Sequence, residues 1–409
     1  MLVLSPFPAL MFLLLLVGYR CDVRAQVLAM QPGRSSNTTI VTGAERLEAY
    51  LHLLRDKRVA VIANQTSRVG GSHLVDTLLK RGVAVQCVFA PEHGFRGQAG
   101  AGEKIEDGRD QRTGLPVYSL YGKTKKPSTA QLAQVDIILF DIQDVGVRFY
   151  TYISTMHYAM EAAAEQGKAF IVLDRPNPNG FYIDGPVLDT AYRSFVGMHP
   201  IPVVHGCTVG ELAGMINGEK WLKRGLTCQL TVIPCEGYTH ADFYDLPVAP
   251  SPNLPNMASV YLYPSLCFFE ATVVSVGRGT DQPFQCIGYP GNQTGRYSFI
   301  PKDIQGVAMD PPHEGKTCTG HHLSAFGSFY FKSSRMLYLD WLTGLYAASA
   351  DPAGFIRDPS FFDKLAGTDR LRRQVTEGKT PAEIRESWKA ELAAYRTIRR
   401  SYLLYPDFE

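Results

Sequence analysis

Short apolar runs alternate with amphipathic stretches along the first part of the chain, as far as about residue 175. Four nearly continuous runs of β-branched and other apolar residues predict strands covered on both faces, at residues 58–63, 83–90, 136–141 and 169–174. Apolar residues that recur about every 3.6 positions predict helices between them, at residues 73–81, 129–134 and 151–166. Strands that alternate with helices in this way are typical of a parallel α/β layer.

The pattern changes after residue 175, where proline and glycine become frequent and the predicted elements are short. Strands are predicted at residues 229–233 and 325–331, and helices at residues 209–222, 258–269, 335–348, 361–377 and 381–399. We place a domain boundary near residues 180–205, although the proline-rich segment there also suits an active-site loop.

The N-terminus has the pattern of an export signal. Residues 8–19 form an apolar run as long as a signal-peptide core and too short to span a bilayer. Small residues precede a cleavage site before Gln26, although a charged first segment is missing. We expect a cleaved signal peptide at residues 1–25, a flexible leader at residues 26–43, and a periplasmic protein without stable membrane insertion. An uncleaved anchor and a lipidated cysteine are the alternatives.

Composition and charge exclude several classes of protein. The 409 residues include 41 Lys and Arg and 39 Asp and Glu, so the net charge is only +2 and nucleic-acid binding is not expected. A hydrophobic content of 45% is close to the globular average and argues against disorder or multiple membrane spans. The cysteines are irregularly spaced and lack a C-x-x-C, so no zinc ribbon is expected, while one or two disulfides stay open.

Polar clusters follow all four predicted strands of the first part. Carboxylate, amide and guanidinium groups are frequent in these segments, at residues 64–67, 91–97, 141–150 and 174–180. Loops at the carboxyl ends of parallel strands converge on one crevice, where ligands bind. Asp141, Asp144 and Asp174 follow directly on apolar runs, where an unpaired charge is costly. We therefore expect one ligand site surrounded by these clusters, with structural salt bridges as the alternative.

Common cofactor and nucleophile motifs are missing from the sequence. Neither G-x-G-x-x-G nor the P-loop motif occurs, so no nucleotide cofactor is expected. The sequence also lacks the G-x-S-x-G of serine hydrolases and the H-E-x-x-H of metalloproteases. His321 and His322 are adjacent and would point to opposite faces of a strand, so we expect no metal. The chemistry that these absences leave open is acid and base catalysis on a neutral, oxygen-rich substrate.

Glu92 is the candidate general acid. Phe89 and Phe95 flank the loop that contains it, and such apolar surroundings favour a protonated carboxyl group. A second carboxylate would stabilise an oxocarbenium-like centre or activate water, and the candidates are Asp141, Asp144, Asp174 and Glu270. A separation of about 5–5.5 Å between the two carboxyl groups would predict retention of configuration, and one of about 6.5–9.5 Å would predict inversion.

Five sequence strings occur together in a fixed order. They are ANQTS, PEHGFRG, DIQDVGVRFYTY, LDRPNP and SVGRGT, at residues 63–67, 91–97, 141–152, 173–178 and 275–280. Over roughly residues 45–409, the chain resembles the bacterial exo-β-N-acetylmuramidases. The resemblance implies an exo-acting glycoside hydrolase that releases N-acetylmuramic acid from the non-reducing end of peptidoglycan fragments. It also implies a Rossmann-like catalytic domain and a smaller α/β domain with a cleft between them, which we assign to residues 44–200 and 201–409.

The resemblance also assigns roles to individual residues. By motif match Glu92 is the catalytic acid, while the second catalytic group is Asp144 or Asp141. Muramic acid carries a lactyl carboxylate, which suits the planar fork of an arginine, and Arg148, Arg175 and Arg278 are available. The expected substrate-binding residues are Asn64, His93, Arg148, Tyr150, Asp174, Asn177, His205, Glu270, Arg278 and Thr280. Ion pairs for the arginines, and core positions for the aromatic residues and His205, are the alternatives.

Other functions stay open at this point. A non-catalytic periplasmic receptor would also have two α/β lobes, and would bind a sugar or muropeptide without hydrolysing it. An amidase or esterase acting on peptide stems lacks a convincing nucleophile motif. In a substrate-assisted glycosidase, the acetamido oxygen of the sugar would replace the second carboxylate. The expected partner is a muropeptide or the disaccharide MurNAc-GlcNAc, and the oligomeric state is open.

Overall fold

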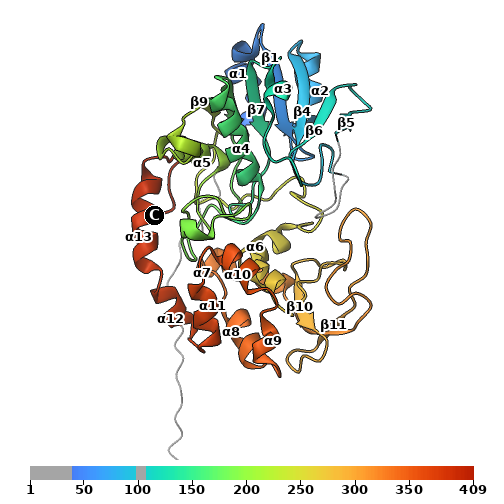
Figure 1. Ribbon diagram of the computed structural model, residues 1–409, viewed down its shortest axis with the longest axis vertical. Coiled ribbons are helices and arrows are strands. Elements are labelled where there is room, and N and C mark those ends of the chain that lie inside the picture. Colours follow the sequence, from blue (N-terminus) through green and yellow to red (C-terminus); the bar gives the residue numbers. More distant parts are fainter. Residues whose placement is uncertain (1–38, 98–106) are drawn as a thin grey trace, which may run out of the picture. The chain divides into compact units, whose positions relative to one another are not determined.

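The computed structural model describes residues 39–97 and 107–409, so the predicted signal peptide lies outside the described residues. The main sheet has seven strands (Figure 1). In spatial order they are β5 (Gly108–Arg109), β6 (Pro116–Ser119), β4 (Ala84–Ala90), β1 (Arg58–Ala63), β7 (Ile137–Asp141), β8 (Ala169–Leu173) and β9 (Gln229–Ile233). All neighbours pair in parallel except β5 and β6. The four strands predicted in the first part therefore lie side by side at the centre.

Each face of the sheet packs into a separate apolar core. Residues of β1 and β7 alternate between the two, with Val61 and Leu139 in one core and Ile62 and Phe140 in the other. The first core is covered by α1 (Leu47–Leu54) and α2 (Leu74–Lys80), and the second by α4 (Tyr152–Glu165) and α5 (Val209–Gly218). Burial on both faces explains why these strands are apolar at nearly every position.

The remaining elements before residue 257 are short. They are η1 (Gly43–Glu45), β2 (Arg68–Val69), β3 (Ser72–His73), α3 (Thr129–Leu132), η2 (Thr190–Tyr192) and η3 (Lys223–Gly225). The expected leader is ordered where it is described, since the backbone N–H of Val41 donates to Glu236 at 3.0 Å and that of Gly43 to Asp174 at 2.9 Å. The expectation of a flexible leader is thus wrong for its last residues, and residues 26–38 lie outside the described residues.

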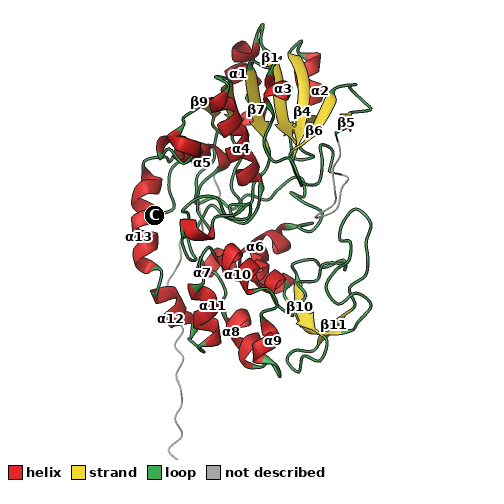
Figure 2. Ribbon diagram, in the orientation of Figure 1, coloured by secondary structure: helices red, strands yellow, loops and turns green. Residues whose placement is uncertain are grey.

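The second part combines helices with a small antiparallel sheet (Figure 2). The sheet order is β10 (Cys286–Tyr289), β12 (Cys318–His322) and β11 (Tyr297–Phe299). The helices are α6 (Met257–Leu266), η4 (Cys267–Ala271), α7 (Ser324–Ser334), α8 (Asp340–Ala347), α9 (Pro352–Phe355), α10 (Pro359–Ala366), α11 (Arg370–Thr376), α12 (Pro381–Glu386) and α13 (Lys389–Arg400). The expected fold class, a Rossmann-like parallel sheet followed by a smaller α/β part, is confirmed.

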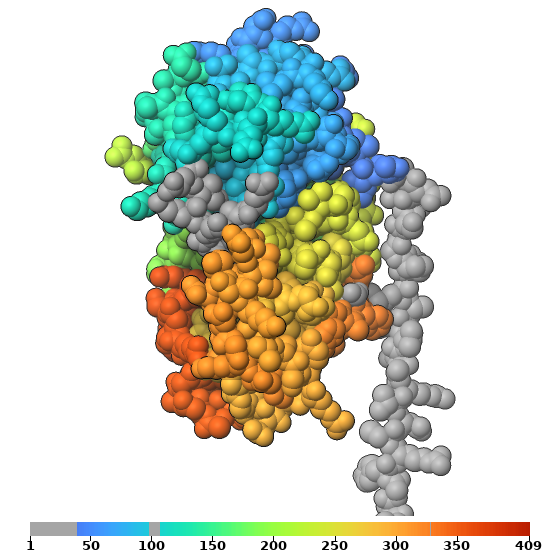
Figure 3. Space-filling view, turned by 90° about the vertical axis from the view of Figure 1, so that its right-hand side faces the viewer, coloured from blue at the N-terminus to red at the C-terminus, as the bar shows by residue number. Residues whose placement is uncertain are grey.

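The two parts share one core and exchange elements. The core on the α4 face of the sheet continues through α6, α8 and α10. Strand β9 comes after the division expected at residue 200, yet it completes the main sheet. Helix α13 contacts the segment just before α5, where Arg399 donates to the carbonyl oxygen of Gly206 at 2.7 Å and Tyr395 to that of His205 at 2.7 Å. Figure 3 shows the yellow segment around residue 250 between the blue and the orange parts of the surface.

Residues 325–331 form part of helix α7, and the strand predicted there is wrong. The aromatic residues that suggested a strand lie at helical spacing, with Phe326 stacked on Tyr330 at 4.8 Å between ring centroids. Gly327 allows α7 to cross α6 closely, because a Cβ atom at this position would come within 2.6 Å of Leu262. Tertiary packing against α6 therefore outweighs the β propensity of this segment.

No disulfide forms among the described residues, where all seven cysteines are buried with free thiols. The disulfides that the sequence left open are therefore not present in this part of the chain. None of the helices in the described ranges has both the length and the apolar character needed to cross a membrane.

His73 caps helix α2 in a way that requires a neutral imidazole. Its Nδ1 accepts from the backbone N–H of Val75 at 3.2 Å, and its Nε2 lies 2.9 Å from the carbonyl oxygen of Asn64, to which it donates. Burial lowers the pKa of His73 to about 4, although the bond to Asn64 opposes the shift. Protonation would remove the acceptor that caps the helix.

The variant His73→Asn should therefore be less sensitive to acid than the wild type. A histidine whose pKa falls from 6.5 to about 4 on folding stabilises the fold above pH 6.5, and this contribution is lost as the pH falls towards 4. Asparagine is a good helix cap that does not titrate. Urea unfolding at pH 7 and pH 4 should show the wild type losing about 3 kcal/mol more than the variant. Equal losses in the two proteins would contradict the assignment.

Candidate active site

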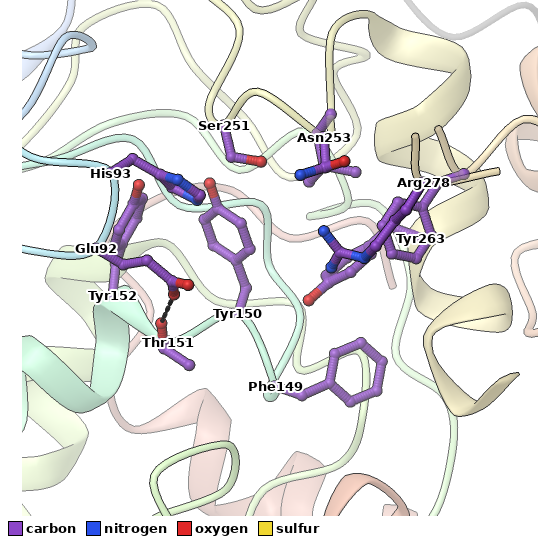
Figure 4. A pocket seen from close by; sticks show the side chains of 12 residues that line it. Glu92, His93, Phe149, Tyr150, Thr151, Tyr152, Ser251, Asn253, Tyr263 and Arg278 are labelled. Carbon is purple, nitrogen blue, oxygen red and sulfur yellow. Dashed lines mark hydrogen bonds between the residues drawn. The ribbon is translucent and has the colours of Figure 1, made fainter. Parts of the chain in front are cut away.

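A pocket lies where the carboxyl end of the main sheet meets the second part of the chain (Figure 4). The empty space within it, part of which is open to solvent, is about 440 Å³. Its lining comes from four stretches distant in sequence: Glu92 and His93; Phe149, Tyr150, Thr151 and Tyr152; Ser251, Asn253 and Leu254; and Tyr263, Arg278 and Phe284. The pocket therefore exists only in the folded chain.

Glu92 enters this pocket from a tight turn after strand β4. The backbone N–H of Gly94 donates to Pro91 at 3.1 Å, and His93 adopts a left-handed conformation with φ of 70°. The turn leaves the carboxyl group of Glu92 partly exposed, and the hydroxyl of Thr151 donates to its Oε2 at 3.3 Å. Tyr121 is a second neighbour, since burial and then the charge of Glu92 raise its pKa. The carboxyl group is thus held at the pocket wall by hydroxyl groups.

Arg278 enters the pocket from the opposite side (Figure 4). It lies between Gly277 and Gly279, which both have φ of 78° and face backbone carbonyls where a Cβ atom would not fit. Its Nε donates to Glu270 at 2.6 Å, and its guanidinium lies over the ring of Phe284 at 5.0 Å. Burial disfavours the charge of Arg278, but attraction to Glu270 outweighs it and raises the pKa.

Aromatic rings form much of the remaining wall. Phe149 and Phe284 each pack edge to face against Tyr263, with ring centroids 5.3 and 4.9 Å apart. Asn253 donates to the carbonyl oxygen of Val307 at 2.8 Å, which fixes its side chain. Its buried Oδ1 has no hydrogen-bond partner in the described part of the chain and remains able to accept from a ligand. Apolar walls with a few polar groups are typical of a pocket for a small polar ligand.

Four of the residues predicted from the sequence line this pocket: Glu92, His93, Tyr150 and Arg278. Glu270 contacts the site through Arg278. The expectation that all polar strand-end clusters surround the same cavity is wrong, because residues 64–67 and 174–180 are absent from its lining. In the cluster at residues 141–150, Asp141, Asp144 and Arg148 form internal hydrogen bonds. Their polar side chains therefore have the structural role that the sequence analysis gave as the alternative.

Asp141 and Arg175 form a buried ion pair away from the pocket lining. The Nε and Nη2 atoms of Arg175 donate to the two carboxylate oxygens at 2.6 and 2.9 Å. Side-chain exposure is 5% for Arg175 and zero for Asp141, and Arg175 also donates to the carbonyl oxygen of Arg68. The geometry joins the ends of β7 and β8 and leaves neither group in contact with the pocket.

Asp174 caps a helix instead of binding in the pocket. Its Oδ1 accepts from Gly210 at the start of α5 at 2.7 Å, while Thr208 and Tyr405 donate to its Oδ2 at 2.7 and 2.5 Å. Burial raises the pKa of Asp174 to about 6, although these hydrogen bonds oppose the shift. Asn177 is also internal, since it donates to Cys207 and accepts from Asn179 at 2.8 Å each.

Asp144 lies behind the pocket wall. Its Oδ1 accepts from the backbone N–H of Gly146 at 2.7 Å, whereas its buried Oδ2 has no partner among the residues described. Burial raises the pKa of Asp144 to about 7. The charge of Asp144 adds to the burial that raises the pKa of Tyr150 and of Tyr152. Asn64 also supports the wall, with its Oδ1 accepting from Thr66. Asp144 is therefore close to two tyrosines of the pocket wall but does not itself line the pocket.

Three further predicted residues form hydrogen bonds with backbone groups. Arg148 is fully buried and donates to the carbonyl oxygens of Pro186, Ile201 and Leu365 at 2.7–2.9 Å. His205 is buried, and its Nδ1 accepts from Cys207 at 3.2 Å. Thr280 donates to Gly277 at 2.7 Å within the turn after Arg278. None of the three lines the pocket.

Several lining residues carry no signal of their own in the sequence. Ser251, Asn253 and Leu254 lie in a proline-rich segment. The one sequence feature there that is typical of a binding loop is that Ser251 and Asn253 are polar residues between prolines. Tyr263 and Phe284 are two among 42 phenylalanines and tyrosines (21 Phe and 21 Tyr). Packing alone selects them from the others. Within the described ranges, no cluster of three His, Cys, Asp or Glu side chains could hold a metal ion.

Comparison with known proteins identifies the family. The family model described as exo-β-N-acetylmuramidase NamZ, N-terminal, matches residues 59–258, and its C-terminal counterpart matches residues 261–405. The peptidoglycan β-N-acetylmuramidase NamZ of Bacillus subtilis (strain 168) is 39% identical over 386 residues, covering 90% of this chain and 91% of that protein.

Two solved structures have the same fold. Both are DUF1343 family proteins from Bacteroides fragilis. One is 46% identical with a TM-score of 0.83, covering 90% of this chain and all of the other, 100%. The second is 30% identical with a TM-score of 0.75, covering 90% of this chain and 99% of the other. The resemblance inferred from the five strings is thus confirmed, and the chain belongs to the exo-β-N-acetylmuramidase NamZ family of glycoside hydrolases.

Proposed function

We propose that this protein acts on peptidoglycan fragments and releases N-acetylmuramic acid from their non-reducing ends, with Glu92 as the general acid. The observation that carries the proposal is the position of the Glu92 carboxyl group, which faces a pocket with a guanidinium on its far side. The name of the Bacillus subtilis relative, a peptidoglycan β-N-acetylmuramidase, supports the substrate class.

In this mechanism the proton of Glu92 passes to the glycosidic oxygen as the bond from that oxygen to the anomeric carbon breaks. Positive charge develops on the sugar ring, and water finally adds to the anomeric carbon and releases a proton, which restores the protonated carboxyl group of Glu92. Thr151 and Tyr121 hold the carboxyl group beside the pocket, so that its proton reaches the departing oxygen. The aromatic wall of Phe149, Tyr150 and Tyr263 limits the water around it.

The proposal is tested with the purified protein and peptide-free glycans that carry N-acetylmuramic acid at the non-reducing end. We expect mass spectrometry to detect free N-acetylmuramic acid from the earliest times, with the rest of each chain shortened by one sugar. Internal fragments would contradict exo action. Binding of N-acetylmuramic acid without any hydrolysis would favour a receptor. Release of peptide from a muropeptide assayed in parallel, with its glycosidic bonds left intact, would favour an amidase.

We further propose that the protein is exported and acts in the periplasm, because residues 8–19 have the composition of a signal-peptide core. Expression of the full chain in a bacterial host should give a periplasmic product whose N-terminal sequence starts at Gln26. Fractionation followed by N-terminal sequencing measures both. A product that keeps Met1 and stays in the cytoplasm would contradict this localisation.

A further inference from the structure

The structure distinguishes between the three arginines that are available for a substrate carboxylate. Arg148 donates to three backbone carbonyl oxygens and is fully buried. Arg175 is paired with Asp141 through its Nε and Nη2 atoms. Arg278 alone among these three lines the pocket that contains Glu92. Its environment therefore decides whether the pocket recognises an anion.

The guanidinium of Arg278 is fixed on one edge and open on the other. Its Nε donates to Glu270 at 2.6 Å, and its plane lies against the ring of Phe284 at 5.0 Å. Its two Nη groups make no hydrogen bond to any residue in the described ranges, and they point into the pocket (Figure 4). The side chain is 22% exposed, so the open edge remains accessible to a ligand.

Glu270 is itself held in place. The thiol of Cys267 donates to its Oε2 at 3.4 Å, which leaves Oε1 for Arg278. Both residues lie in η4, which follows α6 and belongs to the buried core of the second part. The left-handed glycines on either side of Arg278 fix the backbone from which its side chain extends. The guanidinium is thus preorganised before a ligand binds, which lowers the entropic cost of binding.

We propose that Arg278 determines the specificity of this site by binding the lactyl carboxylate of the terminal N-acetylmuramic acid through its two Nη groups, and that Glu270 is the positioning residue that holds it. The inference rests on the proposed function and goes further by naming the group that distinguishes muramic acid from N-acetylglucosamine, which lacks the lactyl ether. A planar guanidinium binds a carboxylate with two parallel hydrogen bonds.

The arrangement of the pocket fits the chemistry of this sugar. The anomeric carbon and the carbon that carries the lactyl group lie on opposite sides of the acetamido-bearing carbon. A ring bound between Glu92 and Arg278 would present the glycosidic oxygen to one wall and the carboxylate to the other (Figure 4). Tyr121 responds to both charges, because Glu92 raises its pKa and Arg278 opposes the shift. The two groups therefore act on the same small region.

The test compares ligands that differ in the charge or in the presence of the lactyl group. The affinities of N-acetylmuramic acid, of its lactyl amide and of N-acetylglucosamine are measured by calorimetry on the wild type and on Arg278→Met. We expect Arg278→Met to weaken the binding of N-acetylmuramic acid by about 30- to 1,000-fold, which is the range for the loss of one partner of a desolvated charged pair. The two uncharged ligands should bind the wild type and the variant alike.

Further variants separate recognition from folding. Arg278→Lys should recover part of the affinity, because it keeps the charge but not the bidentate fork. Glu270→Gln should weaken the binding of N-acetylmuramic acid by a smaller factor than Arg278→Met does, and should leave the binding of the amide unchanged. Arg296→Met is the matched control, since Arg296 is exposed and does not line the pocket. The melting temperatures of all variants are compared with that of the wild type.

The outcomes also separate this inference from the function on which it rests. If the wild type hydrolyses a muramide but Arg278→Met weakens all three ligands by the same factor, Arg278 does not read the carboxylate and the inference fails alone. It fails in the same way if the wild type binds N-acetylmuramic acid and its amide equally. If the wild type cleaves no muramide, the proposed function fails, whatever the ligand affinities.

Discussion

The variant Glu92→Gln is expected to lose about 10²- to 10⁴-fold in turnover of a MurNAc-GlcNAc disaccharide, which is the range for removal of a general acid. Glutamine keeps the size of the side chain and can still accept the hydrogen bond from Thr151, but it has no proton to donate to the glycosidic oxygen. Substrate affinity should change little, because the carboxyl group contributes its proton mainly in the transition state.

The leaving group makes this prediction specific for acid catalysis. A dinitrophenyl muramide releases a stable anion that needs little protonation, so Glu92→Gln should lose much less activity on it than on the disaccharide. Glu48→Gln is the control, since Glu48 is exposed on α1 and remote from the pocket lining. Turnover of the disaccharide within tenfold of the wild type would rule out Glu92 as the acid. Equal losses on both substrates would indicate a different role for this carboxyl group.

The variant Arg175→Met should lose about 3–5 kcal/mol of unfolding free energy, because it leaves the carboxylate of Asp141 buried without its partner. Asp141 is fully buried, and Arg175 is 5% exposed, so solvent cannot replace the lost hydrogen bonds. Urea denaturation followed by circular dichroism measures the change. The double variant Arg175→Met with Asp141→Leu removes both charges and should recover much of the loss.

An exposed ion pair provides the control for this experiment. Arg373 pairs with Asp369 at 3.2 Å, with 58% and 31% of the side chains exposed, so Arg373→Met should cost less than about 1 kcal/mol. A loss below about 1 kcal/mol for Arg175→Met would show that the buried pair contributes little to stability. Asp141→Asn, assayed where it is folded, should keep its turnover, and a 10²-fold loss with unchanged stability would instead support a catalytic role for Asp141.

The central strands of this protein follow from the pattern of apolar residues in the sequence. Strand β1 begins and ends at the predicted residues, and β7 and β8 differ from their predictions by a single residue at one end. These strands are buried on both faces, so their apolar runs have few other structural solutions. The order of strand and loop also brought Glu92 to the carboxyl edge of the sheet, where the pocket lies.

Which polar residues belong to the pocket depends on contacts that form when the chain folds. Asp141, Asp174 and Arg148 resemble Glu92 in the sequence, because all of them follow buried strands, yet each is satisfied by an internal partner. Arg278 reaches the pocket from a turn 186 residues after Glu92 (278 − 92). A local sequence pattern fixes where a charged group emerges from an element, but the partner that neutralises it comes from chain segments that only folding brings together.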